Sequence, residues 1–125
     1  MTRFLRIILL IIGIYLIFIG VLYVLAPSPA ESLLQVSLPD RATAMIHGAT
    51  DLAIAFLCLA IVVRGQIRKG EYQFLLVFGV LHVLTFALLI TLDIYTTAQA
   101  LPPAIIWTVL TALLGLGGSR QELLT

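Results

Sequence analysis

The sequence has little charge and almost no cysteine. Only 10% of its 125 residues are charged, whereas 62% are hydrophobic. Soluble domains are about half apolar and about a quarter charged, so the composition excludes an ordinary soluble domain. The single cysteine, Cys58, excludes a disulfide within the chain and a zinc site made of several cysteines. The net charge of +1, with no long basic block, argues against a nucleic-acid partner.

Four apolar runs are present, and each is about long enough to cross a lipid bilayer as a helix, which takes roughly 20 mostly apolar residues. They predict an all-α protein, an integral membrane bundle of four transmembrane helices that forms a single membrane domain. The last run begins with Pro102 and Pro103, which a helix tolerates in its first turn. The predicted spans are residues 7–26, 42–63, 72–95 and 101–118.

The longest connection, between the first two spans, carries a helix-start signal. Ser28 as the N-cap, Pro29 at the first helical position and Glu31 two residues later form a capping box. We therefore expect a short helix at the outer membrane surface, with an ordered loop as the alternative. The two halves of the chain share no repeated motif, so an inverted-repeat transporter is unsupported.

The distribution of basic residues predicts the orientation. In a four-span arrangement, only Arg41 lies on the outer side, and six basic residues lie on the other: Arg3, Arg6, Arg64, Arg68, Lys69 and Arg120. Lysine and arginine are enriched in cytoplasmic loops. We therefore expect a multi-pass protein of the inner (plasma) membrane with both termini in the cytoplasm. A cleaved secretory signal is the alternative for the first run, but its apolar stretch exceeds the usual length of about 7–15 residues.

His47, Asp51 and His82 lie inside the apolar runs, where an ionised side chain costs about 2.5–3.5 kcal/mol at the bilayer centre. His47 and Asp51 are four residues apart and so share a helical face. If the second and third spans are antiparallel neighbours, Asp51 comes within a turn of His82 near the membrane middle. This predicts a buried polar column that begins at Asp93 near the outer surface. Further polar side chains extend it: Thr85, Thr108, Thr111, Tyr15 and Tyr23.

The polar column has several interpretations. It is either a functional site or a structural contact, and polar contacts between membrane helices contribute only about 0.6 kcal/mol on average. A bis-histidine haem is disfavoured, because His47 and His82 come out about 9 Å apart along the membrane axis. A metal site made of His47, Asp51, His82 and one more oxygen is a further alternative. No phosphate-binding glycine loop, HExxH or GxSxG motif is present.

Small residues predict where the helices approach each other. Close packing of membrane helices uses glycine, alanine, serine and threonine, and Trp107 is typical of an anchor at the membrane interface. The expected small faces comprise Gly13 and Gly20 in the first span, and Thr108, Thr111, Gly115 and Gly118 in the fourth.

The layout resembles that of the small DoxX-like membrane proteins of bacteria. The first span ends in a tyrosine-then-proline segment, YVLAPSPA, and the second contains a glycine, in IHGATDLAIAF. After a basic inner loop, the third span ends at a short outer turn with proline, ALPPAII. Asp51 corresponds to the acidic residue expected in the second span of DoxX, although the residue type differs, and the histidine of its first span is absent here. The resemblance implies a four-helix membrane architecture and carries over no catalytic residue.

Three functions follow, in this order of preference. The first is a binding or accessory protein in the lipid bilayer, which holds a small hydrophobic molecule such as a quinone or isoprenoid, or docks onto a larger membrane complex. The second is a proton or small-ion pathway in a homo-oligomer, with Asp51 and His82 as the relay. The third is an enzyme that acts on a lipid and uses the same pair as acid and base. The residues identify no cofactor and do not favour an enzyme.

Overall fold

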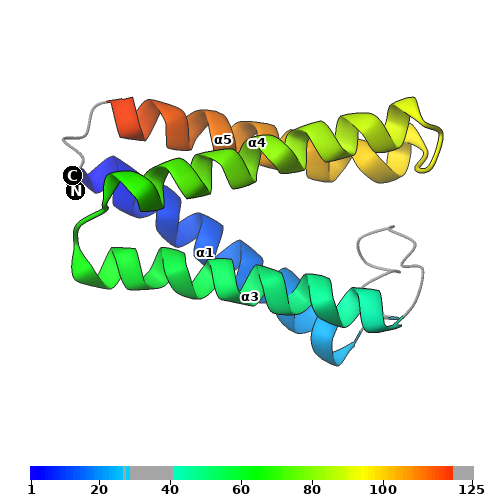
Figure 1. Cartoon of the computed structure of the whole chain (residues 1–125), viewed down its shortest axis with the longest axis horizontal. Coiled ribbons are helices and arrows are strands. Elements are labelled where there is room, and N and C mark those ends of the chain that lie inside the picture. The colour runs from blue at the N-terminus through cyan, green and yellow to red at the C-terminus, as the bar shows by residue number, and fades with distance from the viewer. Residues whose placement is uncertain (27, 29–40, 120–125) are drawn as a thin grey trace. The chain divides into compact units, whose positions relative to one another are not determined.

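A computed structural model describes residues 1–26, 28 and 41–119. Over these residues the chain forms four long helices, labelled in Figure 1: α1 (Arg3–Leu25), α3 (Arg41–Arg64), α4 (Lys69–Thr91) and α5 (Thr97–Ser119). Each helix is long and apolar enough to cross a membrane. The predicted all-α class and the four apolar candidate spans are therefore confirmed. The short helix predicted after Ser28 falls in residues 29–40, outside the described part of the chain.

The helices belong to two compact units. One unit is Leu9–Arg64, which contains most of α1 and all of α3. The other combines Met1–Ile8 with Gly65–Thr125, so the first turns of α1 belong with α4 and α5. The candidate site residues are thereby divided between two separate packing environments.

In the unit Leu9–Arg64, α1 and α3 run antiparallel and approach each other at two glycines. A Cβ added to Gly20 would lie 2.8 Å from the carbonyl oxygen of Gly48, and one added to Gly48 would lie 2.6 Å from that of Gly20. Only glycine lets two helix backbones come this close. Gly13 gives a second contact, with Leu59 3.3 Å from its added Cβ. The small face predicted for Gly13 and Gly20 is confirmed, and Gly48 is its partner.

In the other unit, α4 and α5 form an antiparallel hairpin whose helices also meet at small residues. A Cβ added to Gly79 would collide with the Thr111 hydroxyl, and one added to Gly118 would collide with the Tyr72 ring. The Tyr72 hydroxyl donates a hydrogen bond of 3.4 Å to the carbonyl oxygen of Gly115. The prediction that Thr111 and Gly118 lie on a packing face is confirmed.

The start of α5 is set by a capping box that the sequence analysis missed. The Thr96 N–H donates to Gln99 Oε1 at 3.0 Å, and the Gln99 N–H donates back to Thr96 Oγ1 at 3.3 Å. These bonds satisfy two N–H groups that lack partners at a helix start, so α5 begins at Thr97. Pro102 and Pro103 therefore lie inside the helix. The prediction that they open its first turn is wrong.

The end of α4 is a Schellman motif with Asp93 at its left-handed position. Asp93 has a φ of 54° and is exposed. Its N–H donates to the Ile90 carbonyl at 3.1 Å, and the Ile94 N–H donates to the Leu89 carbonyl at 3.0 Å. Glycine is the usual residue at this position, and aspartate is among the few others that adopt it. The structure thus accounts for Asp93 as a helix terminator.

We expect Asp93→Gly to raise the free energy of unfolding by about 0.5 kcal/mol, because glycine adopts a positive φ without the steric cost of an L side chain. Gly65, which follows α3 with a φ of 74°, is the matched position. Gly65→Asp is expected to lower the same free energy by about 1 kcal/mol. Thermal unfolding in mild detergent, followed by circular dichroism, measures both variants. Destabilisation of similar size in both would contradict the assignment of Asp93.

Candidate functional site

The seven candidate residues do not form a buried cluster. Among the described residues, no polar or charged side chain is fully buried. Asp51 belongs to the unit Leu9–Arg64 and His82 to the other unit, so their pairing stays a prediction. Four candidates are exposed (His47, Thr85, Asp93 and Thr108), and three are partly buried (Asp51, His82 and Thr111).

Asp51 lies near the middle of α3, and its charge acts on Tyr15 of α1, which belongs to the same unit. The Asp51 carboxylate acts electrostatically on the Tyr15 hydroxyl, and both side chains are only partly buried. Further along the same helical stripe, Ala55 and Cys58 are fully buried, and Val62 is 8% exposed. Asp51 and Tyr15 are therefore the polar end of an otherwise apolar packing face. Tyr15 was predicted from the sequence as part of the polar column. That Asp51 acts on Tyr15, while His47 is exposed, was not predicted.

His47 lies off this face. The packing face of α3 at this level is formed by Gly48, whose added Cβ would lie 2.6 Å from the Gly20 carbonyl and 2.9 Å from Tyr23 Cβ. Successive residues of a helix are about 100° apart around its axis, so the rotation that directs Gly48 toward α1 leaves His47 exposed. Within this unit His47 therefore does not pack with Asp51 against α1, and its place in a polar column stays a prediction.

His82 lies in an aromatic cluster between α4 and α5. Its ring centroid is 4.2 Å from that of Phe78 and 4.5 Å from that of Trp107. His82 Nδ1 is 2.9 Å from the Phe78 carbonyl oxygen, and because a carbonyl only accepts, this nitrogen carries the proton. Trp107 contacts Phe78 edge-on at 5.5 Å and is only 5% exposed. The prediction of Trp107 as an interfacial anchor is therefore wrong, since it packs midway along α5.

The three candidate threonines have different environments. Thr108 is exposed and donates to the Ala104 carbonyl of its own helix at 2.7 Å. This bond satisfies the hydroxyl without a polar column and places Thr108 outside the predicted small face. Thr85 is exposed as well. The Thr111 hydroxyl oxygen is buried against Gly79, and it makes no hydrogen bond with the described residues.

The described residues contain no group of three or more histidine, cysteine, aspartate or glutamate side chains placed to hold a metal ion. No protein-family model, curated protein or solved structure matches the chain. The resemblance to DoxX-like proteins therefore stays a prediction. The fold defines a class instead: a small helical protein in which the described residues form four helices apolar enough to span a membrane.

Proposed function

We propose that this chain is a multi-pass inner-membrane protein, with both termini in the cytoplasm, that binds a small hydrophobic molecule through Asp51 and Tyr15. The observation that carries this proposal is the partly exposed Asp51 carboxyl group, midway along an apolar 24-residue helix, whose charge acts on the hydroxyl of Tyr15. Ionisable side chains within a membrane span usually face a partner, because their isolation in hydrocarbon is costly. The partly exposed surface of Asp51 leaves room for such a partner.

The chemistry of the pair selects the class of ligand. A carboxyl group has two oxygens with several hydrogen-bonding positions, and a tyrosine hydroxyl both donates and accepts. A molecule with an apolar body and one hydroxyl or carbonyl group, such as an isoprenoid alcohol or a quinone, matches this arrangement. Its oxygen binds at Asp51 and Tyr15, and its body lies against exposed apolar side chains of α1 and α3.

A proton pathway ranks below ligand binding. Such a path needs polar groups that continue from Asp51 toward the cytoplasmic end of α3. Along that stripe, the residues Ala55, Cys58 and Val62 are buried and apolar, and they offer no site for a proton. An enzyme ranks lower again, because the acid or base that interacts with Asp51 in the described part of the unit Leu9–Arg64 is Tyr15, and a tyrosine transfers protons near neutral pH less readily than a histidine.

A second candidate function is docking onto a larger membrane complex, and α4 favours it. Only 11% of the most apolar 18-residue stretch of α4 is buried, compared with 39% for α1. The remaining surface of α4 contacts either lipid or another protein. If docking is the function, the purified chain is expected to carry a protein partner in fixed proportion and no small molecule.

The test of ligand binding is solvent extraction and mass spectrometry of the protein purified in mild detergent. We expect about one hydrophobic molecule per chain in the wild type. Asp51→Leu is expected to weaken binding about tenfold or more, because a hydrogen bond to a charged group contributes about 1.5–3 kcal/mol. Tyr15→Phe is expected to weaken it about two- to tenfold, because a hydrogen bond between neutral groups contributes about 0.5–1.5 kcal/mol. Asp93→Asn is the control, since Asp93 lies at an exposed helix end and asparagine also adopts its positive φ. An empty wild type, or equal losses in the two aspartate variants, would contradict the proposal.

A further inference from the structure

The imidazole ring of His82 lies against aromatic rings from both helices of the α4–α5 hairpin. Its centroid is 4.2 Å from that of Phe78 on α4, with 48° between the ring planes, and 4.5 Å from that of Trp107 on α5, with 33° between them. Trp107 also meets Phe78 edge-on, at 5.5 Å and 75°. Histidine is the side chain that ordinarily changes its charge between pH 5 and 8. The aromatic contact between these two helices therefore contains a group that can take up a proton.

The hydrogen bond of His82 fixes where that proton goes. Nδ1 lies 2.9 Å from the carbonyl oxygen of Phe78, one turn earlier in the same helix, and it carries the hydrogen because a carbonyl only accepts. The neutral ring therefore takes up its second proton at Nε2. The Nδ1 bond stays intact in the charged form, since both nitrogens of an imidazolium are donors. Protonation thus adds a positive charge to a ring whose orientation is held by its own helix.

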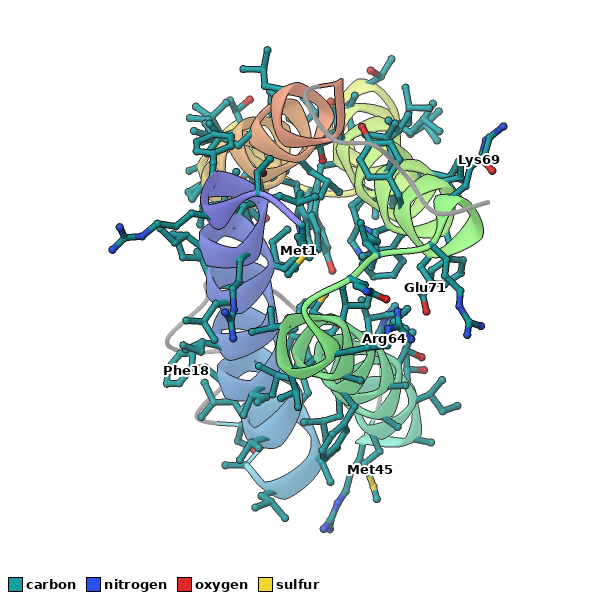
Figure 2. All side chains as sticks on the ribbon, turned by 90° about the vertical axis from the view of Figure 1, so that its left-hand side faces the viewer. Met1, Phe18, Met45, Arg64, Lys69 and Glu71 are labelled. Carbon is teal, nitrogen blue, oxygen red and sulfur yellow. The ribbon has the colours of Figure 1, made fainter. Side chains whose placement is uncertain are left out.

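Neither helix of the hairpin places another ionisable side chain at the level of His82. α5 contains none between Thr97 and Ser119. On α4, all others lie at its start, the end that faces the viewer in Figure 2. The nearest of them in sequence is Tyr72, which is ten residues from His82, or about 15 Å along the helix axis. Asp93, just after the end of α4, is eleven residues away in the other direction.

The remaining ionisable groups in the described part of this unit lie at its ends. The first turns of α1 pack against the last turn of α5, where Leu5 lies 3.1 Å from the Cβ that Gly117 would carry. Gly117 is ten residues beyond Trp107, so this contact is about 15 Å from the aromatic rings along α5. Within this unit, a charge on His82 is therefore met by the two aromatic rings and not by a carboxylate. The groups at the ends are the N-terminus, Arg3, Arg6, Arg68 and Tyr95.

We propose that His82 is a proton-sensitive contact of the hairpin: the imidazolium formed at acid pH is held against the rings of Trp107 and Phe78, and it strengthens the packing of α4 against α5. A cation within about 6 Å of an aromatic centroid is attracted by the ring, most strongly by tryptophan. Both centroid distances lie inside that limit. The added stability is present at acid pH and is lost as the pH rises through the titration of His82. The inference is independent of the ligand proposed at Asp51 and Tyr15.

The test compares the full chain in mild detergent at pH 5 and pH 8, by thermal unfolding and by tryptophan emission. Trp107 is the single tryptophan, so its emission reports the charge on the neighbouring ring, and we expect it to fall on acidification. The rise of the unfolding midpoint from pH 8 to pH 5 is expected to be about 2–8 °C larger in the wild type than in His82→Phe. Phenylalanine keeps an aromatic ring at this position but takes up no proton.

Two further variants make the comparison specific. His47→Phe is the matched control, because it removes the other of the chain's two histidines, which is exposed on α3. It is expected to respond to pH as the wild type does. Trp107→Phe keeps His82 and replaces its strongest aromatic partner by a weaker one. It is expected to reduce the pH-dependent shift of the midpoint, which tests the contact even where His82→Phe does not fold.

Three results would overturn the inference. One is a pH dependence that persists in His82→Phe or disappears in His47→Phe, which assigns the response to another group. Another is a wild-type midpoint that falls on acidification relative to that of His82→Phe, which means that removing the charge from water outweighs the attraction of the rings. The third is a response that disappears in Asp51→Leu, which identifies the Asp51 carboxylate as the partner of the charged ring. Asp51→Leu also separates the two proposals, since it is expected to weaken ligand binding and to leave the pH dependence unchanged.

Discussion

Gly48→Ala is expected to destabilise the unit formed by α1 and α3 by about 1–3 kcal/mol, the usual range for an overpacked interior. The new Cβ would lie 2.6 Å from the Gly20 carbonyl oxygen, an atom of the backbone that no side-chain rotation can move. The two helices must therefore separate along their crossing. Alanine is the better helix former by about 1 kcal/mol. A net loss of stability must therefore come from the contact between the two helices. Thermal unfolding in mild detergent measures the change.

Two other glycines serve as matched controls for this prediction. A Cβ added to Gly70 meets nothing within 4 Å, and one added to Gly115 meets only Leu76 at 3.9 Å, an ordinary contact. Alanine at either position is expected to leave the unfolding midpoint unchanged or to raise it, because only the helix propensity changes. If Gly48→Ala behaves as these controls do, the close crossing of α1 and α3 is not the packing that stabilises the protein.

Gly79→Ala is expected to lower the stability of the α4–α5 hairpin by about 1–3 kcal/mol, and a second substitution is expected to restore it. The added Cβ would collide with the Thr111 hydroxyl. That hydroxyl is buried and makes no hydrogen bond with the described residues, so Thr111→Ala removes the obstacle and an unsatisfied polar atom together. In the double variant, most of the loss should be recovered.

Thr111→Val distinguishes a steric contact from a polar role of this threonine. Valine replaces the hydroxyl by a methyl group of similar size, so Gly79→Ala combined with Thr111→Val is expected to stay destabilised. The interaction energy comes from a double-mutant cycle in the same unfolding measurements. If the effects of Gly79→Ala and Thr111→Ala simply add, Thr111 does not contact Gly79 in the folded protein.

Local features of the sequence were enough for the class of fold and for part of the helix packing. The number of long helices in the described part of the chain followed from the lengths of the apolar runs, because span length depends on composition alone. Gly13, Gly20 and Gly118 were identified as packing positions, since close helix contacts require small residues wherever they occur. The start of α5 was also encoded locally, in Thr96 and Gln99. The predicted start lay instead at the two prolines that follow.

The rotation of each helix about its own axis was not determined locally. Ala55 and Cys58, on the predicted stripe through Asp51, are buried, whereas His47 is exposed, because the Gly20–Gly48 contact fixes which residues of α3 face α1. The same limit applies to Trp107. Its residue type suggested the membrane interface, whereas the aromatic contacts with Phe78 and His82 hold it inside the hairpin.

The sequence by itself determined that this protein is helical, has apolar spans and carries ionisable side chains within them, because hydrophobicity and span length are sums over neighbouring residues. Only the tertiary structure decided what surrounds the polar side chains: the charge of Asp51 acts on Tyr15, and the His82 ring contacts Phe78 and Trp107. The physical reason is that a rotation of about 100° moves a side chain to the next face of a helix. Contacts between residues distant in the sequence set that rotation, and no single span encodes it.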